Sequence, residues 1–67
     1  MYLEERQTVG EKLVSLRGRM QQSEVATAVG ISVSALSMYE QDKRIPRDEV
    51  KERLADFYCT TVEKIFF

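Results

Sequence analysis

Residues 22–40 read QSEVATAVGISVSALSMYE, and this stretch decides the fold of the chain. Two short segments with helical apolar spacing meet in it at Val29-Gly30-Ile31-Ser32. Gly30 permits the positive φ of a sharp turn, and Ser32 can cap a new helix by accepting a hydrogen bond from a first-turn amide. The small Ala26, four residues before Gly30, lets the second helix cross closely over the first. The pattern predicts a helix-turn-helix, although any other corner between two helices can show the same spacing.

Further helices are predicted on both sides of this corner. Thr8-Val9-Gly10-Glu11 fits a capping box, and Arg17-Gly18 sets the end of that first helix with a left-handed glycine. We expect the second helix at about residues 22–28 and the third at 33–41. A fourth follows Pro46, and Thr61 caps a short fifth. Apolar side chains at helical spacing are expected to face the core: Val9, Leu13, Leu16, Val25, Ala26, Val29, Leu36, Tyr39, Val50, Leu54, Phe57, Tyr58, Val62, Ile65 and Phe66.

Length and composition exclude most other classes of protein. The chain has 67 residues, no His and one Cys, which indicates one small domain without a zinc site. No apolar run reaches the roughly 18–20 residues of a membrane span, and the acidic start predicts no signal peptide. The lone Cys59 cannot form an internal disulfide, which fits a reducing cytoplasm. We expect no enzyme, cofactor, metal or small-molecule ligand, because neither a catalytic base beside Cys59 nor a glycine-rich phosphate loop is present.

Residues 9–66 resemble the Cro/C1 (Xre-type) helix-turn-helix family of bacterial and phage transcriptional regulators. The stretches that carry the resemblance are GEKLVSLR (10–17), QSEVATAVGISVSALSMYE (22–40), DKRIPRDEV (42–50), LADFY (54–58) and TTVEKIFF (60–67). The chain is most similar to short stand-alone members that end at the fifth helix. The resemblance implies an all-α, compact five-helix bundle of the lambda-repressor-like DNA-binding type. Residues 8–67 would form this domain after an N-terminal extension of residues 1–7.

The resemblance also implies roles for particular residues. Gln22 would contact a DNA phosphate and brace the recognition helix, and Glu40 would pair with Arg17. Lys43 and Arg44 would follow the DNA backbone. Base edges would be read by Ser32, Val33, Ser34, Ser37 and Met38. Serine hydroxyls can meet any base edge, and Val33 and Met38 suit the thymine methyl group.

Each of these residues also has a structural interpretation. Gln22 fits a solvated first turn, Val33 a partly buried position, and Met38 a dimer surface. Lys43 and Arg44 fit an ordinary solvated loop.

Four features depart from the family pattern. The turn between the first and second helices, Gly18-Arg19-Met20-Gln21, is about two residues shorter than in commoner members. Positions 33, 34, 37 and 38 hold no Arg, Asn or Gln, so bidentate contacts to guanine or adenine are not available from them. Gln21 stands where a Ser or Thr usually caps the second helix, which predicts a weaker cap. Cys59 replaces the usual Gly or Asn after the fourth helix, and a left-handed conformation there would be strained.

Charge is distributed so that a net charge of −1 does not exclude DNA. Residues 12–23 hold three cations and no acid, and residues 43–53 hold five cations and three acids. These two positive segments predict a small basic surface for contact with DNA phosphates. The affinity of one copy of the chain should therefore be modest, and two copies should be needed. We therefore expect a homodimer on half-sites about 34 Å apart. Ile65 and Phe66 can fill the core, but Phe67 has no place there, which suggests a dimer seam at residues 65–67.

The sequence thus predicts a cytoplasmic regulator, encoded by a bacterium or phage, that binds double-stranded DNA and acts by default as a repressor. No membrane partner is expected. The alternative is a protein-interaction module, such as an antitoxin or anti-regulator, that turns the third helix toward protein. The plain surface of Ser, Ala, Val and Met along that helix leaves this alternative open.

Overall fold

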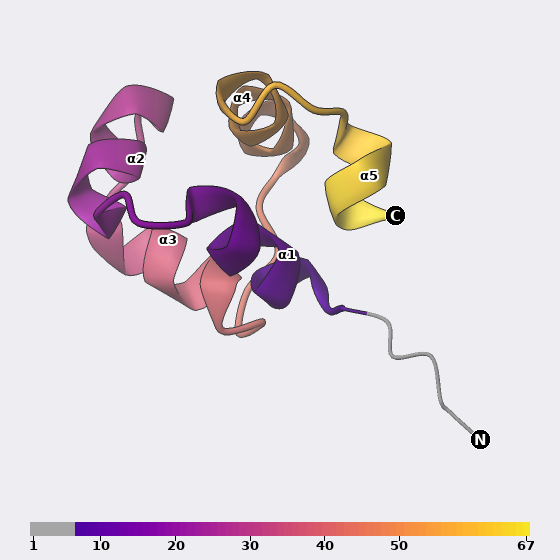
Figure 1. Ribbon diagram of the computed structural model, residues 1–67, viewed down its shortest axis with the longest axis horizontal. Coiled ribbons are helices and arrows are strands. Elements are labelled where there is room, and N and C mark those ends of the chain that lie inside the picture. The colour runs from indigo at the N-terminus through magenta and orange to yellow at the C-terminus, as the bar shows by residue number, and fades with distance from the viewer. Residues whose placement is uncertain (1–6) are drawn as a thin grey trace.

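Five helices and no strand make up residues 7–67, which are the residues that the computed structural model describes. They are α1 (Val9–Arg17), α2 (Gln22–Val29), α3 (Val33–Glu40), α4 (Asp48–Phe57) and α5 (Val62–Phe66). The predicted all-α bundle is therefore confirmed, with α2 one residue longer and α3 one residue shorter than expected. Of the expected N-terminal extension, residues 1–6 lie outside the described residues. Figure 1 shows α2 and α3 at one side of the molecule and α4 and α5 at the other, and α1 packs against both α3 and α5.

The predicted helix caps are present. The hydroxyl of Thr8 accepts from the Glu11 amide at 3.1 Å, and the Glu11 carboxylate accepts from the Thr8 amide at 3.0 Å. This reciprocal pair is a capping box. The Ser32 hydroxyl accepts from the Ala35 amide at 3.0 Å, and the Thr61 hydroxyl accepts from the Lys64 amide at 3.2 Å. Local sequence therefore fixes where α1, α3 and α5 begin.

The corner between α2 and α3 has the geometry that the sequence predicts. Gly30 has φ 84° and ψ 36°, which is the left-handed region. The amides of Gly30 and Ile31 both donate to the Ala26 carbonyl, at 2.8 and 2.9 Å. Gly18 differs, because its φ is 60° but its ψ of −123° lies outside the left-handed helical region. Cys59 adopts a φ of 56°, a positive value that is uncommon for a non-glycine residue.

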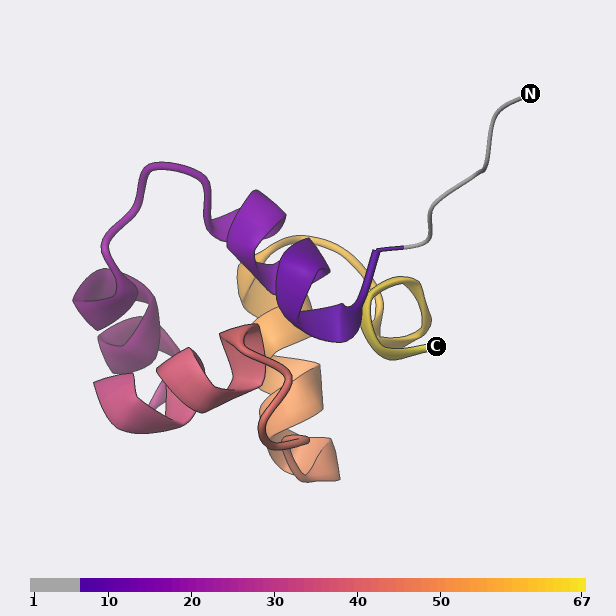
Figure 2. The same cartoon turned by 90° about the horizontal axis from the view of Figure 1, so that it is seen from below.

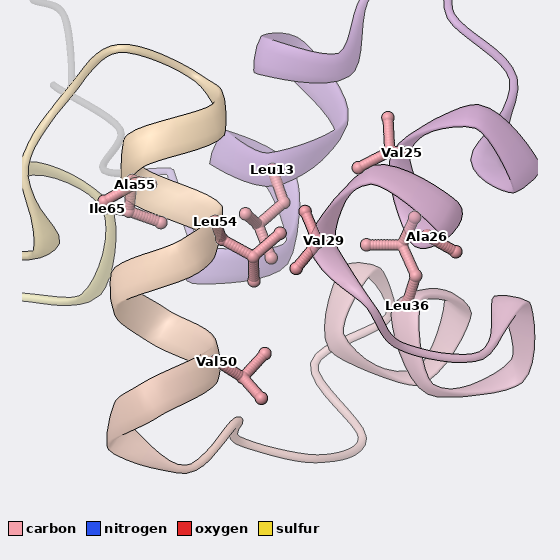
Figure 3. Close-up of a cluster of buried hydrophobic side chains, with 9 residues drawn as sticks. All are labelled: Leu13, Val25, Ala26, Val29, Leu36, Val50, Leu54, Ala55 and Ile65. Carbon is pink, nitrogen blue, oxygen red and sulfur yellow. The ribbon is translucent and has the colours of Figure 1, made fainter.

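The core draws side chains from all five helices. Its buried residues, shown in Figure 3, are Leu13, Val25, Ala26, Val29, Leu36, Val50, Leu54, Ala55 and Ile65. The prediction for Leu16 is wrong, since its side chain is 40% exposed. The inward face of α1 passes through Gly10, Leu13 and Arg17, and this leaves Leu16 at its margin.

A close contact between α1 and the end of α3 fixes the position of α1. A Cβ atom at Gly10 would overlap the backbone carbonyl of Glu40 and lie 2.8 Å from the Asp42 carboxylate. That carboxylate accepts from the Gly10 amide at 2.9 Å and from the Thr8 hydroxyl at 2.6 Å. Asp42 itself has a φ of 61°. Asp42, two residues beyond the end of α3, thus acts as a second cap for α1, and it holds the loop that begins at Lys43.

The cap of α2 is incomplete, which gives a stability prediction. Among the described residues, no first-turn amide of α2 donates to the Gln21 side chain, while the Glu24 carboxylate accepts from the Gln21 amide at 3.0 Å. Gln21→Ser would complete the box and should raise the free energy of unfolding by about 1 kcal/mol. Urea unfolding measures it, with Thr61→Ala as a control that should lower the stability by a similar amount. A Gln21→Ser midpoint at or below that of the parent would contradict the prediction.

The Asp42 cap predicts a pH dependence of stability. The hydrogen bond from Thr8, and then that from Gly10, lowers the pKa of Asp42 below its ordinary value of 3.8. A group with a lowered folded-state pKa stabilises the fold above its unfolded pKa, and this contribution is lost as the pH falls through the folded value. Asp42→Asn keeps the shape of the side chain but can accept only one of the two hydrogen bonds.

We expect Asp42→Asn to lower the thermal midpoint most at pH 7 and progressively less below about pH 4. Asp56→Asn is the matched control, because among residues 7–67 no donor bonds its carboxylate. A deficit of Asp42→Asn that is constant from pH 7 to pH 3 would refute the assigned cause.

Candidate nucleic-acid interface

A shallow hollow runs along the outer face of α3, which lies at an edge of the molecule in Figures 1 and 2. The residues that line it are Gln22, Val33, Ser34, Ser37, Met38, Gln41 and Lys43. Six of the eight residues that the sequence marked for DNA contact therefore share one surface. The other two, Ser32 and Arg44, do not line it. Ser32 caps α3, because its hydroxyl accepts from the Ala35 amide.

The side chains of α3 in this hollow project away from the core. Val33 is 44% exposed and Met38 is 39% exposed, so neither is a core residue. Ser34 is exposed, and Ser37 is partly buried. The surface combines two hydroxyls with two apolar side chains. Such a surface can form hydrogen bonds with base edges and contact a thymine methyl group.

A buried carboxylate holds α3 in place behind this surface. Glu40 is the one buried charged residue within residues 7–67, and its side chain is 4% exposed. The Arg17 guanidinium donates to it from Nε at 2.8 Å and from Nη2 at 3.1 Å. Gln22 donates from Nε2 to the same carboxylate at 2.8 Å. The ion pair that the resemblance implied thus exists, and Gln22 is its third member.

Arg17 has a second role in this arrangement. The hydrogen bond to Glu40 raises the pKa of Arg17 above its ordinary value. Arg17 also donates from Nη1 to the Met20 carbonyl at 2.8 Å, which ties the turn before α2 to the same group. The carboxylate therefore connects α1, the α1–α2 turn, α2 and α3. Gln22, at the start of α2, lines the hollow and also donates to the buried carboxylate of Glu40.

Tyr58 lies against the other side of this arrangement. Its hydroxyl oxygen is buried without a hydrogen-bond partner in the part of the chain that the structure describes. Burial, and then the negative charge of nearby Glu40, raise the pKa of Tyr58 to about 12, while Arg17 opposes the shift. The Tyr58 ring meets Phe57 edge to face, with centroids 5.2 Å apart. Both rings pack on the core, as the sequence predicts, and are not exposed stacking surfaces.

The basic loop after α3 divides between two surfaces. Lys43 lines the hollow, whereas Arg44 lies in a separate groove with Val9, Asp42, Ile45, Lys51, Phe66 and Phe67. Ile45 is 81% exposed and Phe67 is 80% exposed. The Lys51 ammonium lies 5.5 Å from the ring centroid of Phe66 and 5.3 Å from that of Phe67. The expectation that Phe67 lies outside the core is confirmed.

Two residues of these surfaces were missed by sequence reasoning. Ile45 has no periodic partner, and its only signal is that it is an apolar residue directly before Pro46. Gln41 was expected as the last residue of the third helix without a role of its own. It follows α3 as its C-terminal cap, and its side chain lies in the hollow.

A family model described as helix-turn-helix, of the Cro/C1 type, matches residues 16–65, which is 50 of the 67 residues. The searches of curated proteins and of solved structures find no match. Within residues 7–67, no helix has the length and apolar character needed to span a membrane, and no group of three or more metal-ligating side chains occurs.

Proposed function

The chain belongs to the Cro/C1-type helix-turn-helix family of DNA-binding regulators, and from this premise we propose that it binds specific sites in double-stranded DNA with α3 in the major groove. The observation that carries the proposal is the outer face of α3. Val33, Ser34, Ser37 and Met38 share one exposed surface there, with Gln22 and Lys43 at its sides. This is where a major-groove helix would meet base edges.

The residues around this face suit contacts to phosphate. Lys43 supplies a positive charge at the end of the hollow, and Arg44 a second on the neighbouring surface. The first turn of α2, where Gln22 lies, presents amides that can donate to phosphate oxygens. In this proposal Gln22, Lys43 and Arg44 position the protein on the duplex. Ser32 at the helix cap, Val33, Ser34, Ser37 and Met38 read the sequence.

A homodimer would place two such faces on one side of the duplex. The surface proposed for the contact is the groove with Ile45 and Phe67, which are more than three-quarters exposed. Large apolar side chains so exposed often mark a contact surface, and a twofold axis would bury both residues of both copies. With half-sites about one helical turn apart, the dimer would act as a repressor by covering the DNA that polymerase needs.

In vitro selection from randomised duplexes tests the proposal. The parent protein should enrich a paired motif. Ser34→Ala with Ser37→Ala should change the preferred sequence, because base contacts specify. Lys43→Ala with Arg44→Ala should weaken binding to all duplexes alike and reduce the salt slope by about 0.9 for each phosphate that the variant no longer neutralises. Lys64→Ala, which removes a cation from α5, is the control and should leave both properties unchanged.

Two results would count against the proposal. If no motif is enriched and no duplex is bound at low salt, the DNA-binding function is wrong and the protein-interaction alternative gains support. If the serine pair and the basic pair have the same effect on preference and on affinity, the division between reading and positioning residues is wrong.

The dimer proposal makes a separate prediction. Phe67→Ser or Ile45→Ser should raise the dimer dissociation constant at least about tenfold, because burying such a side chain contributes roughly 1.5–3 kcal/mol. Sedimentation equilibrium measures the constant. Leu16→Ser is the matched control, since Leu16 is an exposed apolar residue outside this groove. A monomeric parent protein, or a dimer that only Leu16→Ser weakens, would contradict the proposed seam.

A further inference from the structure

Gln41 occupies a place on the α3 face and has no role in the recognition proposed above. Its Nε2 donates to the Ser37 hydroxyl at 2.8 Å, and its side chain is exposed. Positions 33, 37 and 41 follow one another at four-residue spacing, so they form a single stripe along the helix. Val33, Ser37 and Gln41 all line the hollow. The stripe thus ends in a side-chain amide.

The amide of Gln41 supplies what the other positions of the face lack. Val33, Ser34, Ser37 and Met38 carry no group that can donate and accept at once in a bidentate contact. After its bond to Ser37, the Gln41 amide keeps one N–H and the Oε1 oxygen free. A donor beside an acceptor matches the major-groove edge of adenine, which offers N7 as acceptor and the N6 amino group as donor. We propose that Gln41 is a specificity-determining residue that reads an adenine in the major groove, an inference that rests on the proposed DNA-binding function.

The direction of the Gln41 side chain supports this role. Side chains on a helix lean toward its N-terminus, and the bond to Ser37 holds the Gln41 amide over the preceding turn. The amide therefore lies beside the base-reading side chains and is turned away from the loop that begins at Lys43. The bond also restricts the conformation of the amide in the free protein, so the side chain loses less conformational entropy when DNA binds.

The other glutamine of the hollow is not free to do the same. The Nε2 of Gln22 is bonded to the buried carboxylate of Glu40 at 2.8 Å, and its side chain is partly buried. Turning that amide to a base would leave a buried charge with one donor fewer, which is costly. Of the two amides that line the hollow, Gln41 is the one that can turn to a base without loss to the core.

Helix geometry places the adenine relative to the other contacts. Residues 37 and 41 are separated by roughly 6 Å along the axis, which is less than two base-pair steps. The adenine should therefore lie within about two base pairs of the position that responds to Ser37→Ala. It should lie on the side away from the position that responds to Ser34→Ala.

The test compares duplex selection for the parent, Gln41→Met and Gln7→Met. Methionine keeps the length of glutamine and removes both hydrogen-bonding groups. Gln7 is a matched control, because it also donates to a serine hydroxyl, that of Ser15 at 3.4 Å, and lies outside the hollow. We expect Gln41→Met to lose its preference at one A·T pair, with discrimination there falling about tenfold to hundredfold. Gln7→Met should keep the parent motif.

A single-atom change in the DNA provides the second arm and needs no variant to fold. Replacing the adenine of that pair by 7-deazaadenine removes the N7 acceptor alone. The parent protein should lose about tenfold in affinity, and Gln41→Met should bind both duplexes equally. If the parent binds both duplexes equally, the inference is wrong.

The remaining outcomes separate this inference from the proposed function. If the parent enriches no motif, the DNA-binding function fails, and the inference fails with it. If the parent enriches a motif that Gln41→Met retains, only the inference fails. Equal weakening of all duplexes by Gln41→Met would show a phosphate contact, and a lost preference at a G·C pair would show a different base. Both results would overturn the adenine assignment.

Discussion

The carboxylate of Glu40 is the interaction on which the arrangement of α1, α2 and α3 depends. A charge removed from water is costly unless donors surround it, and loss of one partner of a buried pair commonly costs about 3–5 kcal/mol. Here Arg17 supplies two donors and Gln22 a third. The net gain in stability from such a group is small, but its geometry is demanding, so it fixes how the three helices cross. The orientation of the α3 face follows from this constraint, because Glu40 is the last residue of α3.

A second constraint acts on the same end of α3 through the backbone. Gly10 lies against the Glu40 carbonyl, and the Asp42 carboxylate bonds the start of α1. The end of α3 is therefore held from its side chain and from its main chain. α4 and α5 complete the core with Leu54 and Ile65, and they do not contribute to the hollow. α4 and α5 thus support the helices that form the hollow, and they contribute Lys51 and Phe66 to the separate groove.

The sequence predicted most of the fold, because most of the fold is set locally. The caps at Thr8, Ser32 and Thr61 and the turn at Gly30 each depend on residues within a few positions, and all are confirmed. Leu16 was misjudged, since the inward face of α1 is decided by the approach of α3 to Gly10 and not by the period of α1 alone. The cap by Asp42 was missed for the same reason, because its bond to Gly10 joins residues 32 positions apart and forms only once α3 packs against α1. The bond from Gln41 to Ser37 is local, at the four-residue spacing of a helix, but the sequence does not show that Gln41 lies in the hollow. The separation of Lys43 from Arg44 is likewise a property of the loop in space. The roles of the site residues toward DNA remain predictions.

The steric contact at Gly10 has a consequence for how such a domain can diversify. No other residue fits there without moving α1 away from α3, so position 10 is closed to substitution while Glu40 keeps its place. Val33, Ser34 and Met38 are exposed or lie outside the core, so they can change freely. Substitutions at these outward positions of α3 therefore leave the buried contacts between the helices in place. Descendants of this chain can acquire new recognition properties by drift on one helix face, and a library built on the same positions would inherit an intact fold.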